Sequence, residues 1–83
     1  MKKILVSIYV IRINEWFDVF LPINISTSDA LELIQKVIVE YSNNNYLINN
    51  NSLLFNCENG MIINLNNSIK FSGLKNGCRV ILY

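Results

Sequence analysis

The sequence contains no histidine, and it has only two cysteines among 83 residues. A structural zinc site needs about four ligands, mostly cysteine or histidine, so a zinc-binding domain is excluded. Catalysis by a Cys-His pair or a Ser-His-Asp triad is excluded for the same reason. Two cysteines are also too few for a disulfide-rich secreted scaffold. We therefore expect no metal and no cofactor.

Charged residues are scarce, at 16% of the chain, and seven basic residues nearly balance six acidic ones. A net charge of +1 does not supply the basic surface that nucleic-acid binding uses, so we expect no nucleic-acid partner. Hydrophobic residues make up 52%, which is enough for one core in a chain of this length. We expect a single domain, residues 1–83, with more apolar surface than an isolated monomer usually has.

The chain also has no long uncharged apolar segment. The opening MKKILVSIYVI resembles a secretory signal, but charges follow at Arg12, Glu15 and Asp18, and no small-residue cleavage site is present. A membrane-spanning helix needs about 20 consecutive apolar residues, which the sequence does not contain. We expect a cytoplasmic protein with no direct membrane insertion.

The residues that could carry chemistry are dispersed. The carboxylates form no evident acid–base pair. The glycines lie in separate turns and make no phosphate-binding loop. We therefore expect no enzymatic activity. The residues considered were Glu15, Asp18, Asp29, Glu32, Glu40, Glu58, Gly60, Gly73 and Gly77.

Alternating apolar residues predict a hairpin near the N-terminus. Residues 3–13 are rich in β-branched and aromatic side chains, and a second strand, residues 16–23, follows after only two residues. This spacing pairs Tyr9 with Phe20 on one face of the hairpin. The other face is purely aliphatic, so we expect it to pack in the core.

The segment STSDALELIQKVIVEYS predicts one amphipathic helix, because its apolar residues recur at helical spacing. Asp29, with Glu32 three residues later, predicts a capping box in which Asp29 is the N-cap of the helix; Ser28 is the alternative N-cap. The asparagine-rich residues 41–52 then predict a connecting loop. We expect three apolar residues of this loop to fold back as a plug: Tyr46, Leu47 and Ile48.

Three further strands are predicted at residues 52–57, 61–64 and 78–83. A hairpin followed by a helix and more strands predicts an α+β fold, with the helix packed across one face of a mixed sheet of four to five strands. The opposite sheet face has no second layer to cover it.

These segments resemble the ubiquitin-like β-grasp family over essentially the whole chain. FDVFLPINISTSDALELIQKVI is similar to that family's second strand, capped entry and helix. SLLFNCENGMII is similar to its third strand, turn and short fourth strand, and SIKFSGLKNGCRVIL to its final turn and strand. The resemblance implies the ubiquitin-like fold.

Within this family the sequence most resembles the bacterial YukD/EsaB proteins, which are short and lack a reactive tail. The residues FDVFL, at 17–21, are similar to their F-D-L-x-L strand, whereas Cys78 stands where an acidic residue commonly follows the turn glycine. The resemblance implies an adaptor that binds a protein of a type VII secretion system. The alternative is a self-associating structural or regulatory module, a homo-oligomer with no secretion role.

Conjugation and sulfur transfer by ubiquitin-like proteins require an extended tail that ends in glycine. This sequence ends at Tyr83 in a predicted strand and contains no Gly-Gly pair. We therefore expect a protein that acts by non-covalent recognition.

The uncovered sheet face is the predicted binding surface. Its outward residues would form one apolar area with an arginine at the margin, a composition favoured in interfaces. A protein partner, a second copy or the asparagine-rich loop would cover it, whereas a one-residue slip of register would exchange the inner and outer sets. The predicted residues are Leu5, Tyr9, Ile11, Phe20, Leu54, Arg79, Ile81 and Tyr83.

The two cysteines allow two interpretations. Cys57 ends the third predicted strand and Cys78 begins the fifth, and these strands are neighbours in a β-grasp sheet, so the pair could act as a redox switch. The simpler interpretation is two reduced thiols in a cytosolic protein.

Overall fold

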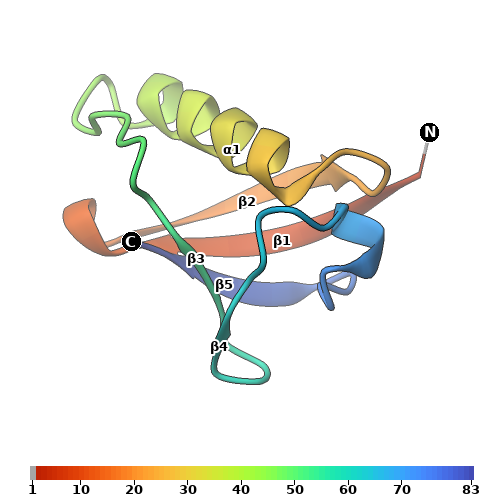
Figure 1. The fold of residues 1–83 in the computed structure, drawn as a ribbon. Coiled ribbons are helices and arrows are strands. Elements are labelled where there is room, and N and C mark those ends of the chain that lie inside the picture. Colours follow the sequence, from red (N-terminus) through yellow and green to blue (C-terminus); the bar gives the residue numbers. More distant parts are fainter. Residues whose placement is uncertain (1) are drawn as a thin grey trace.

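A computed structural model describes residues 2–83. Five strands form one sheet in the order β2-β1-β5-β3-β4, and the helix α1 lies across one face of it (Figure 1). β1 and β5 run parallel, and the other neighbouring strands run antiparallel. The predicted α+β class with a mixed sheet is confirmed. The elements are β1 (Lys3–Val10), η1 (Ile11–Ile13), β2 (Glu15–Pro22), α1 (Thr27–Tyr41), β3 (Leu54–Asn56), β4 (Met61–Ile62), η2 (Ile69–Phe71) and β5 (Cys78–Leu82).

The first hairpin has a longer turn than the spacing predicted. β1 ends at Val10, and the 3-10 turn η1 leads to Asn14, whose φ of 53° is left-handed, a conformation that asparagine tolerates. Tyr9 therefore pairs with Trp16, and the predicted pairing of Tyr9 with Phe20 is wrong. The register moves by an even number of residues, so each side chain keeps its predicted face.

The core lies between α1 and the sheet, and its strand residues alternate as a half-buried sheet requires. β1 and β5 contribute their inward side chains, and α1 contributes one stripe of its surface. The fully buried apolar residues from these three elements are Val6, Ile8, Val10, Ala30, Ile34, Ile38, Val80 and Leu82.

The helix begins at a different cap from the one predicted. The Ser26 side chain accepts a hydrogen bond from the backbone N–H of Asp29 at 3.0 Å, so Ser26 is the N-cap and the predicted caps at Asp29 and Ser28 are wrong. The next residue, Thr27, is buried and donates its hydroxyl to the carbonyl of Asn67 at 2.8 Å. No helix within residues 2–83 is long and apolar enough to cross a membrane.

The asparagine-rich segment is held to α1 by buried polar contacts. Tyr46 is 2% exposed, and its hydroxyl donates to Oε1 of Gln35 at 2.7 Å. The same oxygen accepts the backbone N–H of Asn49 at 2.9 Å, and Nε2 of Gln35 donates to the Asn49 carbonyl at 3.2 Å. Tyr46 is therefore buried as predicted, whereas Leu47 and Ile48 are exposed and that part of the prediction is wrong.

Candidate functional site: the open face of the sheet

The sheet face opposite α1 carries an apolar row that crosses all five strands. Tyr9 is the register partner of both Trp16 and Ile81. Phe55 is the partner of both Ile81 and Ile62. Directly opposite residues in neighbouring strands project from the same face and contact one another. These five residues, here called the aromatic row, lie side by side across the width of the sheet.

The aromatic row is only partly covered by the rest of the molecule. Its two ends, Trp16 and Ile62, are 54% and 58% exposed, and the three central residues are half-buried. The rings of Tyr9 and Trp16 lie 5.2 Å apart, tilted by 50°, which is a favourable aromatic geometry. The Tyr9 hydroxyl donates to Oδ1 of Asn14. Two aromatic side chains are thus held in place before any partner arrives.

A polar row lies two residues along the strands from the aromatic row. It consists of Asp18, Ser7 and Arg79, which are register partners on β2, β1 and β5. The Ser7 hydroxyl donates to Oδ1 of Asp18 at 2.7 Å, and both charged residues are exposed. Beyond the polar row, Leu5 faces Phe20, which is 63% exposed. The open face therefore has two apolar zones with a charged strip between them.

Most of the predicted binding residues lie on this face. Leu5, Tyr9, Phe20, Arg79 and Ile81 occupy outward positions of β1, β2 and β5, as the preceding register shows.

The two remaining outward residues lie beyond the ends of strands. Ile11 belongs to η1 at the end of the hairpin and is 42% exposed. Tyr83 follows β5, is 52% exposed, and donates its backbone N–H to the carbonyl of Leu53 at 3.0 Å.

The prediction for Leu54 is wrong. Leu54 is 1% exposed and pairs with Leu82, which is fully buried, so it points into the core. Its neighbours Leu53 and Phe55 are the outward residues of this part of the chain. The third strand was assigned one residue out of phase, which exchanges its two faces.

Three members of the aromatic row were missed in the sequence: Trp16, Phe55 and Ile62. Trp16 could have been found in the sequence, because it alternates with Asp18 and Phe20 on the outward face of the second strand. The prediction took only Phe20 from that strand. The outward position of Phe55 and Ile62 could be predicted only with the correct phase of β3, because Phe55 belongs to β3 and Ile62 pairs with it.

The cysteines remain separate thiols. Cys57 is exposed, Cys78 is buried, and neither is in a disulfide. The backbone N–H of Cys57 donates to the carbonyl of Arg79 at 3.1 Å, so Cys57 lies beside Arg79. The side chains of Arg79 and Cys78 point to opposite faces because they are successive residues of a strand. No disulfide joins the two cysteines in this structure, and the redox pair stays a prediction.

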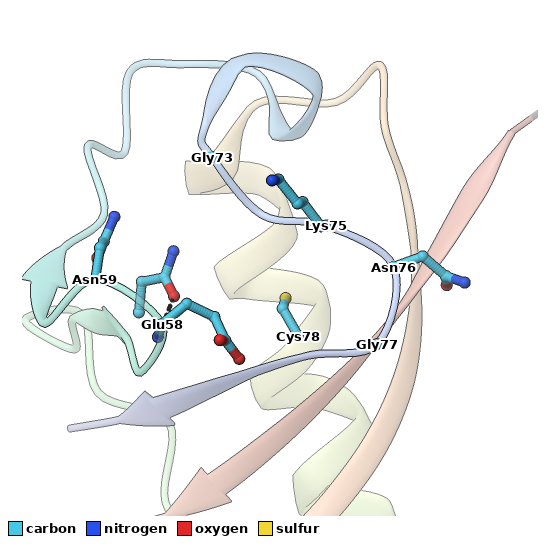
Figure 2. Close-up of a pocket in the computed structure, with 8 residues that line it drawn as sticks. Glu58, Asn59, Gly73, Lys75, Asn76, Gly77 and Cys78 are labelled. Atoms are coloured by element: carbon cyan, nitrogen blue, oxygen red, sulfur yellow. Dashed lines mark hydrogen bonds between the residues drawn. The ribbon is translucent and has the colours of Figure 1, made fainter.

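A shallow cavity of about 450 Å³ lies beside Cys78, between the β3–β4 turn and the loop that leads to β5 (Figure 2). Glu58 and Lys75 contribute its charged side chains. Burial raises the pKa of the Cys78 thiol above its ordinary value, which makes this cysteine a poor nucleophile at neutral pH. Within residues 2–83 no three residues of the metal-binding types are grouped to hold an ion. We find no catalytic arrangement in this cavity.

We expect the two thiols to react at very different rates with an aromatic disulfide reagent at pH 8. Cys57 should react rapidly because it is exposed. Cys78 should react only slowly because burial limits access and raises the pKa of its thiol, which lowers the thiolate fraction. A Cys57→Ser variant should lose the rapid phase, and a Cys78→Ser variant should keep it. Equal rates for the two thiols in the folded protein would contradict the structure.

No protein-family model matches the sequence, and no curated protein matches it. Among solved structures, the chain is similar to the ubiquitin-like domain of the Mycobacterium tuberculosis type VII secretion system protein EccD1, with a TM-score of 0.73 and 15% identity over 99% of this chain and 98% of that one. It is similar to a chain of the MycP5-free ESX-5 inner membrane complex, with a TM-score of 0.78 and 15% identity, covering 100% of this chain and 21% of that chain.

A chain of toluene 4-monooxygenase in complex with 4-bromobenzoate has a comparable likeness, with a TM-score of 0.75 and 15% identity over 98% of this chain and 96% of that one. These likenesses establish the ubiquitin-like β-grasp fold. At such low identities they establish the fold alone, because one fold carries many functions. The function must therefore be argued from the open face.

Proposed function

We propose that this protein is a cytoplasmic ubiquitin-like adaptor that binds a component of a type VII secretion system through the open face of its sheet. It acts by non-covalent recognition and carries out no catalysis. The aromatic row is the single observation that carries this proposal.

The aromatic row has the properties of an interface centre. Tryptophan, tyrosine and arginine are the residues most enriched among those that dominate binding energy, and the open face presents all three types, among them Trp16, Tyr9 and Arg79. The Tyr9 and Trp16 rings already contact one another, so little side-chain entropy is lost when a partner docks on them. A contiguous apolar surface of this kind on a small protein marks an interaction site.

The assignment to type VII secretion is supported by two features. The EccD1 domain, which is part of a type VII secretion protein, has the same fold over almost the full length of both chains. The FDVFL strand, residues 17–21, is similar to that of the YukD/EsaB proteins. The toluene 4-monooxygenase likeness supplies no comparable sequence feature, so the secretion system is the better hypothesis.

We expect Trp16→Glu to reduce capture of the partner by at least about tenfold, since burying an unpaired carboxylate at an interface centre costs several kcal/mol. The measurement is affinity capture from lysate of the source organism, with the captured proteins identified by mass spectrometry. Leu47→Glu is the matched control, because Leu47 is 80% exposed and lies in the asparagine-rich segment, which is held to α1 on the other side of the sheet (Figure 1).

Capture of a type VII secretion component by the wild type and by Leu47→Glu, but not by Trp16→Glu, would support the proposal. Equal capture of that component by all three proteins would remove the aromatic row from the binding site. Failure of the wild type to capture any secretion component would contradict the proposed function.

A further inference from the structure

The charges of the polar row are arranged symmetrically about β1. Asp18 on β2 and Arg79 on β5 are both register partners of Ser7 on β1. Neighbouring strands lie about 4.8 Å apart, so the negative and the positive charge stand at the same level along the strands and at equal distances on either side of β1. The face thus has a negative side and a positive side, with β1 as the dividing line.

We propose that two copies of this protein pack face to face through their open sheet faces, related by a two-fold axis that runs parallel to β1 between the two sheets. This rotation keeps each residue at its level along the strands and exchanges the two sides of the sheet. It places Asp18 of each copy opposite Arg79 of the other. The same rotation places Trp16 opposite the second copy's Ile81, and Tyr9 opposite the second copy's Tyr9.

The charges select this axis over the other symmetric arrangement. A two-fold axis that crosses the strands along the polar row would set β2 opposite β2 of the second copy and β5 opposite β5. Asp18 would then approach the same residue of the other copy, and so would Arg79. Opposed like charges cost several kcal/mol at an interface, whereas opposite charges fix the register of the two partners.

Other features of the face fit a second copy. No other element within residues 2–83 covers the sheet on the side opposite α1 (Figure 1). Ser7 holds the Asp18 carboxylate through the bond at 2.7 Å, so the acceptor for the second copy's arginine is already oriented. The net charge of +1 creates little repulsion between copies. Two-fold, self-complementary contacts of this kind are the commonest form of protein oligomer.

The dimer covers Trp16, Tyr9 and Ile81 of the aromatic row, whereas Phe55 and Ile62 lie on β3 and β4, outside the overlap of the two copies. A partner that binds the covered residues must therefore displace the second copy. The dimer itself does not depend on the proposed function, because it rests only on the register and charges of the face. The free protein would then keep Trp16, Tyr9 and Ile81 covered until a partner competes for them.

The test is sedimentation equilibrium of the wild type, Asp18→Arg, Arg79→Asp and an equimolar mixture of the two variants. The wild type should dimerise with a Kd below about 1 mM. Each variant alone should raise the Kd at least about tenfold, because like charges now face one another twice. In the mixture both contacts pair an arginine with an aspartate, so a heterodimer should form about as tightly as the wild-type dimer.

Glu32→Arg is the control, since Glu32 is exposed on α1, and it should leave the Kd unchanged. Circular dichroism checks that each variant is folded. A wild type that stays monomeric to 1 mM, or a mixture that associates no better than the single variants, would overturn the dimer. If the dimer were overturned but Trp16→Glu still abolished partner capture, the proposed function would stand without the dimer.

Discussion

Replacing Leu54 by alanine is expected to lower the free energy of unfolding by about 2–5 kcal/mol. The side chain is 1% exposed and lies opposite Leu82 in the core. Alanine removes its apolar surface from the core and leaves a cavity that the neighbouring strands can fill only in part. A domain of this size has a total stability of roughly 5–15 kcal/mol, so the variant should lose a large share of it.

Leu53→Ala is the matched control, because it makes the same change one residue earlier at a side chain that is 39% exposed. We expect it to cost less than about 1 kcal/mol. Urea unfolding followed by circular dichroism measures both, and thermal unfolding should show a fall of roughly 4–8 °C for each kcal/mol lost. Similar losses in the two variants, or a larger loss in Leu53→Ala, would mean that the phase of β3 is wrong.

The phase of β3 could not be derived from the sequence for a specific physical reason. In SLLFNC the odd-numbered residues Leu53, Phe55 and Cys57 are all apolar, so alternation predicts that they face the core. The structure instead buries Ser52 and Asn56, each 2% exposed, on either side of the core residue Leu54. Asn56 is tolerated because its Oδ1 accepts the backbone N–H of Glu58 at 2.8 Å.

That inversion carries functional information. Apart from Leu54, this segment turns polar side chains inward, Ser52 and Asn56, and burial in the core of this chain does not explain why the residues between them are apolar. The outward Leu53 and Phe55 are better explained by a surface that a second protein covers. The misassigned phase of β3 and the outward position of Leu53 and Phe55 therefore have the same origin.

Elsewhere the sequence was a better guide. β1 and β5 are central strands with aliphatic residues at alternate positions, and their inward residues are buried as the pattern predicts. Tyr9 and Ile81 were placed correctly on the open face for the same reason. The end of the hairpin was not predictable, because Ile11–Ile13 has strand-like composition but forms the 3-10 turn that leads to Asn14. Tertiary packing determines the conformation of such short β-branched segments.

Replacing Gln35 by alanine is expected to destabilise the fold by about 2–4 kcal/mol and to release the asparagine-rich segment from α1. The variant leaves the buried hydroxyl of Tyr46 and the backbone N–H of Asn49 without the acceptor that both now use. Each buried donor left unpaired costs about 1–3 kcal/mol. Lys36→Ala, at the next and exposed helix position, should stay within about 0.5 kcal/mol of the wild type.

The Tyr46→Phe variant separates the two contributions of Gln35. It removes the hydroxyl but leaves the Asn49 contacts in place, so it should cost only about 0.5–1.5 kcal/mol. The double variant should then cost less than the sum of the two single changes, because the buried hydroxyl is no longer left unpaired. Hydrogen exchange at the Asn49 amide should speed up in Gln35→Ala and stay slow in Tyr46→Phe. Additive losses, or unchanged exchange in Gln35→Ala, would show that this glutamine does not anchor the segment, and that apolar packing of the Tyr46 ring holds it instead.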